Sequence, residues 1–144
     1  MIALNDRTAI NKFELDLSLV KDERISDILF VIASIIALIS TYQAEKEIIA
    51  KEFNKESIAD NSAYTIAASS WTFFIGSIIF TYVSVARYCQ IATDDPDVSP
   101  LTLKGGKYSV VGNIISVIGF CLVAIGDQLK ANASSSSGPA TISR

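Results

Sequence analysis

The sequence predicts an all-α, polytopic helical membrane protein whose three transmembrane helices form a small left-handed bundle. Half of its 144 residues are hydrophobic and only 19% are charged, whereas charged residues make up about a quarter of a typical soluble domain. The uncharged residues are also concentrated along the chain. Three windows contain no Asp, Glu, Lys or Arg, namely Ile28–Ala44, Asn61–Ala86 and Tyr108–Gly126. Charge-free stretches of this length are typical of helices that cross a bilayer.

Residues 1–24 precede the first window and are mixed and charged, which predicts an extramembrane N-terminal tail. Within it, the segment from Phe13 to Leu19 alternates strictly between apolar and polar residues, which is the period of a half-buried strand. Because an isolated strand is unstable in water, a short surface helix or an irregular segment is the preferred interpretation. A strand that pairs with a partner chain is the alternative.

The first span is expected near residues 25–44. Its charge-free window holds 17 residues, the short end for a span, because about 20 residues cross the hydrocarbon core. The following residues 43–60 contain no Gly or Pro and include charged pairs at helical spacing, such as Glu47 with Lys51. We therefore expect the first helix to extend beyond the bilayer. A solvated helical face is the simpler interpretation of its charges, and a partner-docking or interfacial helix is the alternative.

The second span is expected near residues 61–86, whose 26 uncharged residues fit a tilted or over-long membrane helix. The third is expected near residues 108–126, where 19 residues fit one crossing. Between them, residues 87–107 contain two prolines and a Gly-Gly pair, which predicts a loop. The Ser-rich residues 131–144 predict a flexible C-terminal tail. The membrane domain then comprises residues 25–130.

Three crossings would place the two termini on opposite sides of the membrane. The N-terminal tail and the loop after the second span share one side and contain seven Lys and Arg residues, whereas the other side contains five. Cytoplasmic segments carry an excess of these residues. The sequence therefore predicts a multi-pass integral membrane protein with a cytoplasmic N-terminus.

Small residues recur at spacings of three and four in all three expected spans, which places them on one face of each helix. Lipid gives no hydrophobic drive for helix association, so close packing through small residues must supply it. A period near 3.5 predicts left-handed crossings of roughly 20°. Packing within one chain is the simpler interpretation, and a face shared with other subunits is the functional one. The predicted helix-packing residues are Ala33, Ala37, Ser40, Ser70, Ser77, Thr81, Ser84, Gly112, Asn113, Ser116, Gly119 and Gly126.

Asn113 belongs to this set for a different reason. A side-chain amide at that depth requires an interhelical hydrogen bond, which is the simpler interpretation, and a pore-lining or ion-contacting role is the alternative. The two cysteines, Cys89 and Cys121, are expected to be free thiols. On straight helices they would lie roughly 20 Å apart in depth, whereas a disulfide needs Cα atoms within about 7 Å.

Composition excludes several classes of function. The formal net charge is −3 and there is no long basic run, so no nucleic-acid partner is expected. Histidine is absent, which removes the commonest general base and the commonest metal ligand. The expected spans lack the ionisable groups on which proton relays and voltage sensors depend. The acidic segment Asp94–Asp97 lacks the Gly and distal Glu of a calcium loop, so a solvated turn is the preferred interpretation. No catalytic residue, cofactor or metal site is therefore predicted.

These observations predict a small non-enzymatic membrane protein that acts through helix–helix assembly. It would work as a homo-oligomer or as an accessory subunit of a larger membrane complex, surrounded by membrane lipid. The sequence does not determine whether a small-molecule ligand binds. The alternative is a homo-oligomeric pore, holin-like or channel-like. Hydroxyl groups on one face of the second span would line it, from Ser70, Ser77, Thr81 and Ser84.

Overall fold

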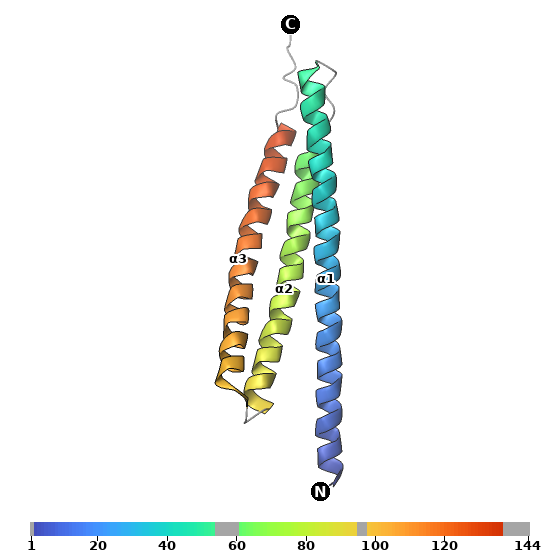
Figure 1. The fold of residues 1–144 in the computed structure, drawn as a ribbon. Coiled ribbons are helices and arrows are strands. Elements are labelled where there is room, and N and C mark those ends of the chain that lie inside the picture. The colour runs from blue at the N-terminus through green and yellow to red at the C-terminus, as the bar shows by residue number, and fades with distance from the viewer. Residues whose placement is uncertain (1, 54–60, 95–97, 137–144) are drawn as a thin grey trace. The chain divides into compact units, whose positions relative to one another are not determined.

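The computed structural model describes residues 2–53, 61–94 and 98–136. It is all-helical, with three helices: α1 (Ile2–Glu52), α2 (Ser62–Asp94) and α3 (Pro100–Ser136) (Figure 1). Each helix is long and apolar enough to cross a membrane. The predictions of an all-helical fold and of three candidate membrane spans are therefore confirmed.

Helix α1 extends well beyond its charge-free window at both ends. Residues 2–52 contain neither Gly nor Pro, so nothing in this segment breaks the backbone hydrogen bonds of a helix. Residues 13–19 are helical, and the strand alternative for them is wrong. At the other end the helix continues to Glu52, as its helix-forming sequence predicted, and residues 54–60 lie outside the described part of the chain.

The loop expected between the second and third spans is much shorter than predicted. Helix α2 continues to Asp94 and α3 already begins at Pro100. Proline is tolerated in a first helical turn because its missing N–H would have no partner there. The Ser99 hydroxyl accepts a hydrogen bond from the Thr102 amide at 3.1 Å, which caps the helix. The side chains of the acidic segment 94–97 lie outside the described residues.

Helix α3 also continues past the expected end of the third span. It reaches Ser136, so residues 131–136 of the predicted C-terminal tail are helical. The remainder of that tail, residues 137–144, lies outside the described part of the chain.

The chain divides into two compact units, and every helix contributes a segment to each. The first unit comprises Met1–Ile28 with Ile75–Val117, and the second comprises Leu29–Phe74 with Ile118–Arg144.

Buried positions on α1 recur every seven residues. Leu19, Ser26, Ala33, Ser40 and Glu47 are all buried, and three of them are small enough to let another helix backbone approach closely. A seven-residue repeat of buried positions is typical of helices that pack side by side over many turns.

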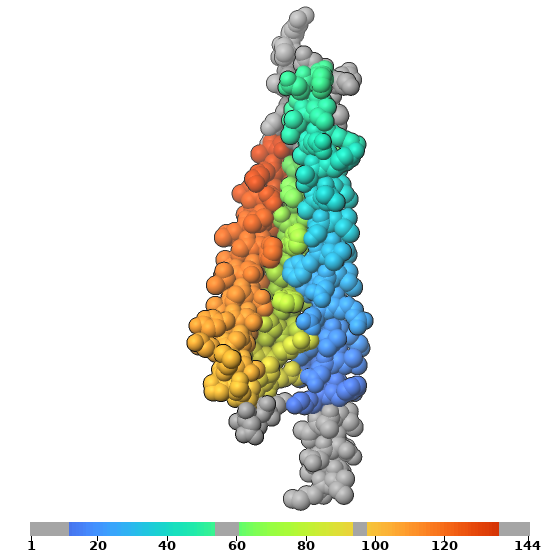
Figure 2. Space-filling model, viewed as in Figure 1, coloured from blue at the N-terminus to red at the C-terminus, as the bar shows by residue number. Residues whose placement is uncertain are grey.

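Large apolar side chains are exposed along all three helices, in contrast to the small buried ones. Leu38, Ile115 and Leu122 are among the most exposed, and one side of this surface is drawn in Figure 2. Extended apolar surfaces of this kind mark sites of membrane or protein interaction.

Candidate functional site

Hydroxyl groups join the helices of the first unit. The Ser26 hydroxyl on α1 donates to the backbone carbonyl of Gly76 on α2 at 2.9 Å. The Thr81 hydroxyl on α2 lies 2.7 Å from the carbonyl oxygen of Ser77 in its own helix and 3.3 Å from that of Asn113 on α3. A carbonyl oxygen has two lone pairs, so it can accept such a bond in addition to its helical one.

Charged and amide side chains join α1 to α2 in the part of the first unit that lies outside the charge-free windows. Arg87 forms an ion pair with Glu23, and the Gln90 amide donates to the Asp16 carboxylate at 3.0 Å. These side chains remain partly exposed, so each contact contributes little to stability on its own. Together they fix which face of α1 contacts α2.

The second unit has hydroxyl bonds of the same kind between α1 and α2. The Ser69 hydroxyl donates to the Ala33 carbonyl at 2.7 Å, and the Ser40 hydroxyl donates to the Ser62 carbonyl at 2.8 Å. Both serines are buried. These bonds join small residues on both helices, as expected where two backbones come close together.

A buried carboxylate joins α2 to α3 in the second unit. Asp127 is 8% exposed, and its carboxylate accepts a 2.6 Å hydrogen bond from the Ser70 hydroxyl and a 3.0 Å one from the Lys130 ammonium group. One residue further along each helix, the Trp71 indole donates to the Gln128 side-chain carbonyl at 3.3 Å. A buried carboxylate requires such donors because burial removes its hydration.

A second buried carboxylate caps the beginning of α2. Glu47 on α1 accepts hydrogen bonds from the Ser62 amide at 3.3 Å and from the Ser62 hydroxyl at 3.0 Å. The amide groups of a first helical turn have no partner within their own helix, and a negative charge near them is favourable. Glu47 therefore fixes where α2 begins relative to α1.

Sequence reasoning missed both carboxylate contacts. In the sequence, Asp127 directly follows the charge-free window of the third span, and Glu47 is spaced as a helical partner of Lys51. The available signal was a carboxylate just after the first and the third charge-free windows, with serine on the neighbouring helix as a donor. Asp127 lies 57 residues from its partner Ser70, and Glu47 lies 15 residues from its partner Ser62.

Aromatic rings bring together all three helices of the second unit. The ring centroids of Phe30 on α1 and Phe73 on α2 are 5.9 Å apart, and Phe120 on α3 lies 5.5 Å from Phe73 and 6.4 Å from Phe30. Separations of 4.5 to 7 Å are the favourable range for aromatic pairs. This cluster is an apolar contact to which all three helices of the unit contribute.

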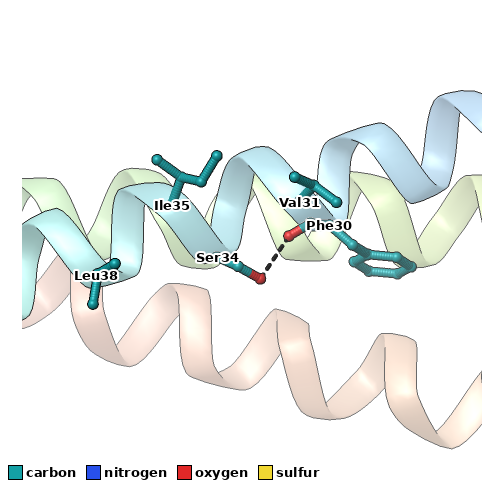
Figure 3. A pocket seen from close by; sticks show the side chains of 5 residues that line it. All are labelled: Phe30, Val31, Ser34, Ile35 and Leu38. Carbon is teal, nitrogen blue, oxygen red and sulfur yellow. Dashed lines mark hydrogen bonds between the residues drawn. The ribbon is translucent and has the colours of Figure 1, made fainter.

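An apolar groove of about 360 Å³ lies on α1 in the second unit (Figure 3). The Ser34 hydroxyl donates to the carbonyl of Phe30 at 2.8 Å, so its proton is already used within the helix. The groove carries no titratable group and is suited to hydrocarbon rather than to a polar ligand. Its lining residues are Phe30, Val31, Ser34, Ile35 and Leu38.

The predicted helix-packing residues occupy three kinds of environment, and their packing role stays a prediction. Four are buried, namely Ala33, Ser40, Ser70 and Ser77. Five are half-buried, namely Ala37, Thr81, Ser84, Asn113 and Gly126. The remaining three, Gly112, Ser116 and Gly119, are exposed on α3.

Within residues 2–53, 61–94 and 98–136, no group of three or more His, Cys, Asp or Glu side chains is placed to hold a metal ion. Cys89 and Cys121 are free thiols. No family model, curated protein or solved structure matches this chain.

Proposed function

We propose that this chain is a small non-enzymatic integral membrane protein that acts by assembling with other membrane helices. It works as a homo-oligomer or as an accessory subunit of a larger membrane complex. The observation that carries this proposal is the exposure of α3. Only 6% of its most apolar 18-residue stretch is buried, against 33% for α2. A third helix that gains so little burial within its own chain has most of its surface left for lipid or for other helices.

The exposed surface of α3 includes positions at which another backbone can approach closely. A Cβ atom added at Gly112 or at Gly119 would meet nothing within 4 Å. Association of helices in lipid depends on such small residues. These positions therefore support an assembly role for α3.

The proposal includes three crossings, left-handed helix contacts and a cytoplasmic N-terminus. The seven-residue repeat of buried positions on α1 supports the handedness, because a 3.5-residue period brings straight helices into a left-handed supercoil. The excess of Lys and Arg on the N-terminal side supports the orientation. Reporter fusions at the two ends of the chain should report opposite sides of the membrane, and the same side for both would refute three crossings.

The burial of Ser70 and Ser77 favours assembly over a pore lined by the second span. These side chains are 5% and 4% exposed, whereas a hydroxyl that lines a water-filled lumen must reach solvent. A membrane-impermeant thiol reagent should therefore fail to label Ser77→Cys in a background that lacks the native cysteines. In vesicles that expose the proposed cytoplasmic side to the reagent, it should label Ser99→Cys, which lies exposed before α3. Labelling at position 77 in intact membranes would favour the pore instead.

Assembly itself is tested by counting copies and by perturbing α3. The chain extracted from membranes should contain more than one copy per particle, or co-purify in a fixed ratio with another membrane subunit. Gly119→Leu should weaken that association without lowering the stability of the single chain, since a Cβ atom added at this position meets nothing within 4 Å. Leu122→Ala is the control, because it removes an exposed side chain from the same helix. Isolated single copies in native membranes would refute assembly.

A further inference from the structure

Three large apolar side chains are exposed on one face of α1 outside its charge-free window. Phe13, Leu17 and Val20 are 67%, 43% and 43% exposed, and their spacings of four and three place them on one helix face. We call these three residues the N-terminal stripe. Residues 12–24 include seven charged side chains, and charged groups are costly within hydrocarbon. Lipid therefore does not cover the stripe, whereas it accounts for the exposed apolar residues of the charge-free windows.

The N-terminal stripe is also separate from the face that α1 uses within its own chain. Leu19 is 2% exposed, and Asp16 and Glu23 bond to α2. Leu17 directly follows Asp16, and Val20 directly follows Leu19. One residue along a helix corresponds to a rotation of about 100° around its axis. The stripe therefore runs beside the intramolecular contact rather than within it.

We propose that a second copy of this chain covers the N-terminal stripe, with the two α1 helices parallel and in register. This inference rests on the proposed assembly function. Copies that insert with the same orientation have α1 helices that run in the same direction, so a symmetric pair must be parallel. In a parallel two-stranded coiled coil, Leu17 occupies heptad position a, while Phe13 and Val20 occupy position d. Each of these residues then packs against its own equivalent.

The charges beside the stripe favour this partner. With Leu17 at position a, Asp16 falls at position g and Lys21 at position e, and in parallel coiled coils a g residue faces the e residue of the next heptad on the other helix. Asp16 therefore faces Lys21 of the second copy, and the symmetric contact occurs twice. One Asp16 oxygen accepts from Gln90, and a carboxylate has further lone pairs for a second donor. Arg24 occupies the following a position and ends the apolar stripe on the membrane side.

Cysteine cross-linking of the full chain in membranes tests this arrangement. In a Cys89→Ser, Cys121→Ala background, Leu17→Cys is compared with Leu15→Cys, which is equally exposed at 44% but lies on another face. Paired position-a residues bring their Cα atoms within disulfide range, so mild oxidation should give a dimer about tenfold faster or more at position 17. Equal cross-linking rates at positions 15 and 17, or no dimer at either position, would overturn the proposal that a second copy covers the N-terminal stripe.

A charge exchange provides the second arm of the test. Asp16→Lys should slow cross-linking at position 17 because two lysines then face each other, and adding Lys21→Asp should restore it. The double variant still lacks the hydrogen bond between Asp16 and Gln90. Restored cross-linking in the double variant would therefore show that Asp16 acts through its contact with the second copy. Failure of rescue would overturn the proposed pairing.

Counting the copies in each particle in the same membranes separates the two proposals. If each particle contains more than one copy but position 17 does not cross-link, the proposed contact at the N-terminal stripe is wrong and the assembly function is still supported. A single copy in every particle, with no partner subunit, overturns both.

Discussion

Ser69 and Ser70 are adjacent, buried serines on α2 whose hydroxyl groups donate to acceptors of different charge. The Ser69 hydroxyl bonds to the neutral backbone carbonyl of Ala33, and the Ser70 hydroxyl bonds to the Asp127 carboxylate. The two side chains are 1% and 5% exposed. Substitution of either serine by alanine removes one oxygen atom from a buried site, so the loss of stability caused by the cavity is the same for both. The difference between the two losses of stability therefore measures the effect of the acceptor's charge on the hydrogen bond.

The expected magnitudes follow from the two acceptors. Hydrogen bonds between neutral groups in membrane helices are worth about 0.6 kcal/mol on average, and the Ala33 carbonyl keeps its helical bond when the Ser69 hydroxyl is removed. Bonds to charged groups contribute about 1.5–3 kcal/mol. We therefore expect Ser69→Ala to cost about 0.6 kcal/mol and Ser70→Ala to cost about 2 kcal/mol. These losses correspond to roughly threefold and thirtyfold increases in the unfolding constant.

Reversible unfolding of the reconstituted chain, followed by helix content or by trapping of the unfolded state, measures both values. A double-mutant cycle then isolates the bond. In an Asp127→Asn background the acceptor is neutral, so Ser70→Ala should cost only about 0.6 kcal/mol there, a coupling of about 1.4 kcal/mol.

Two results would refute this reasoning. If Ser69→Ala destabilises the chain as much as Ser70→Ala does, acceptor charge does not control the strength of these bonds. If the cycle gives a coupling below about 0.3 kcal/mol, within the additivity expected of independent sites, Ser70 and Asp127 do not interact in the folded chain.

Two further predictions concern a matched pair of glycines and the cap of α2. Gly105→Ala should raise stability by about 0.5–1 kcal/mol because alanine is the better helix former, whereas Gly106→Ala should lower it because the new Cβ would lie 2.9 Å from Cδ2 of Tyr88. Thermal unfolding measures the stability of both glycine variants. In a Tyr88→Ala background, Gly106→Ala should no longer lower stability. A gain in stability at both positions would contradict the contact between position 106 and Tyr88. Glu47→Ala should cost about 1 kcal/mol and speed amide exchange at Ser62 about fivefold, and unchanged exchange there would show that the carboxylate does not cap α2.

Charge-free windows located all three helices but not their ends. Hydropathy marks the part of a helix that hydrocarbon can surround, whereas helix ends depend on backbone breakers and caps. Helix α1 extends through a charged segment because nothing in it breaks the backbone. Gly105 and Gly106 lie inside α3, where glycine costs only about 1 kcal/mol relative to alanine, and Pro100 begins that helix rather than interrupting it.

The rotation of each helix about its axis was much harder to predict than its existence. A helix that is apolar on all sides gives no periodic signal for the face it buries. On α3, Gly112 and Gly119 are exposed, while Ala124 and Asp127 are buried. The bond between Ser70 and Asp127 depends on the rotations of two helices, so a pattern within one segment could not reveal it.

The two carboxylate contacts differ in when they can form during synthesis of the chain. Glu47 precedes Ser62 by 15 residues, so the cap of α2 is available as soon as that helix begins. Ser70 precedes Asp127 by 57 residues, which is an interval of about 3–11 s at typical elongation rates. During that interval Asp127 has not yet been synthesised, so the Ser70 hydroxyl must use another acceptor, such as a carbonyl of its own helix. Docking of α3 then replaces that acceptor with the Asp127 carboxylate, so the contact between α2 and α3 is the later of the two to become available.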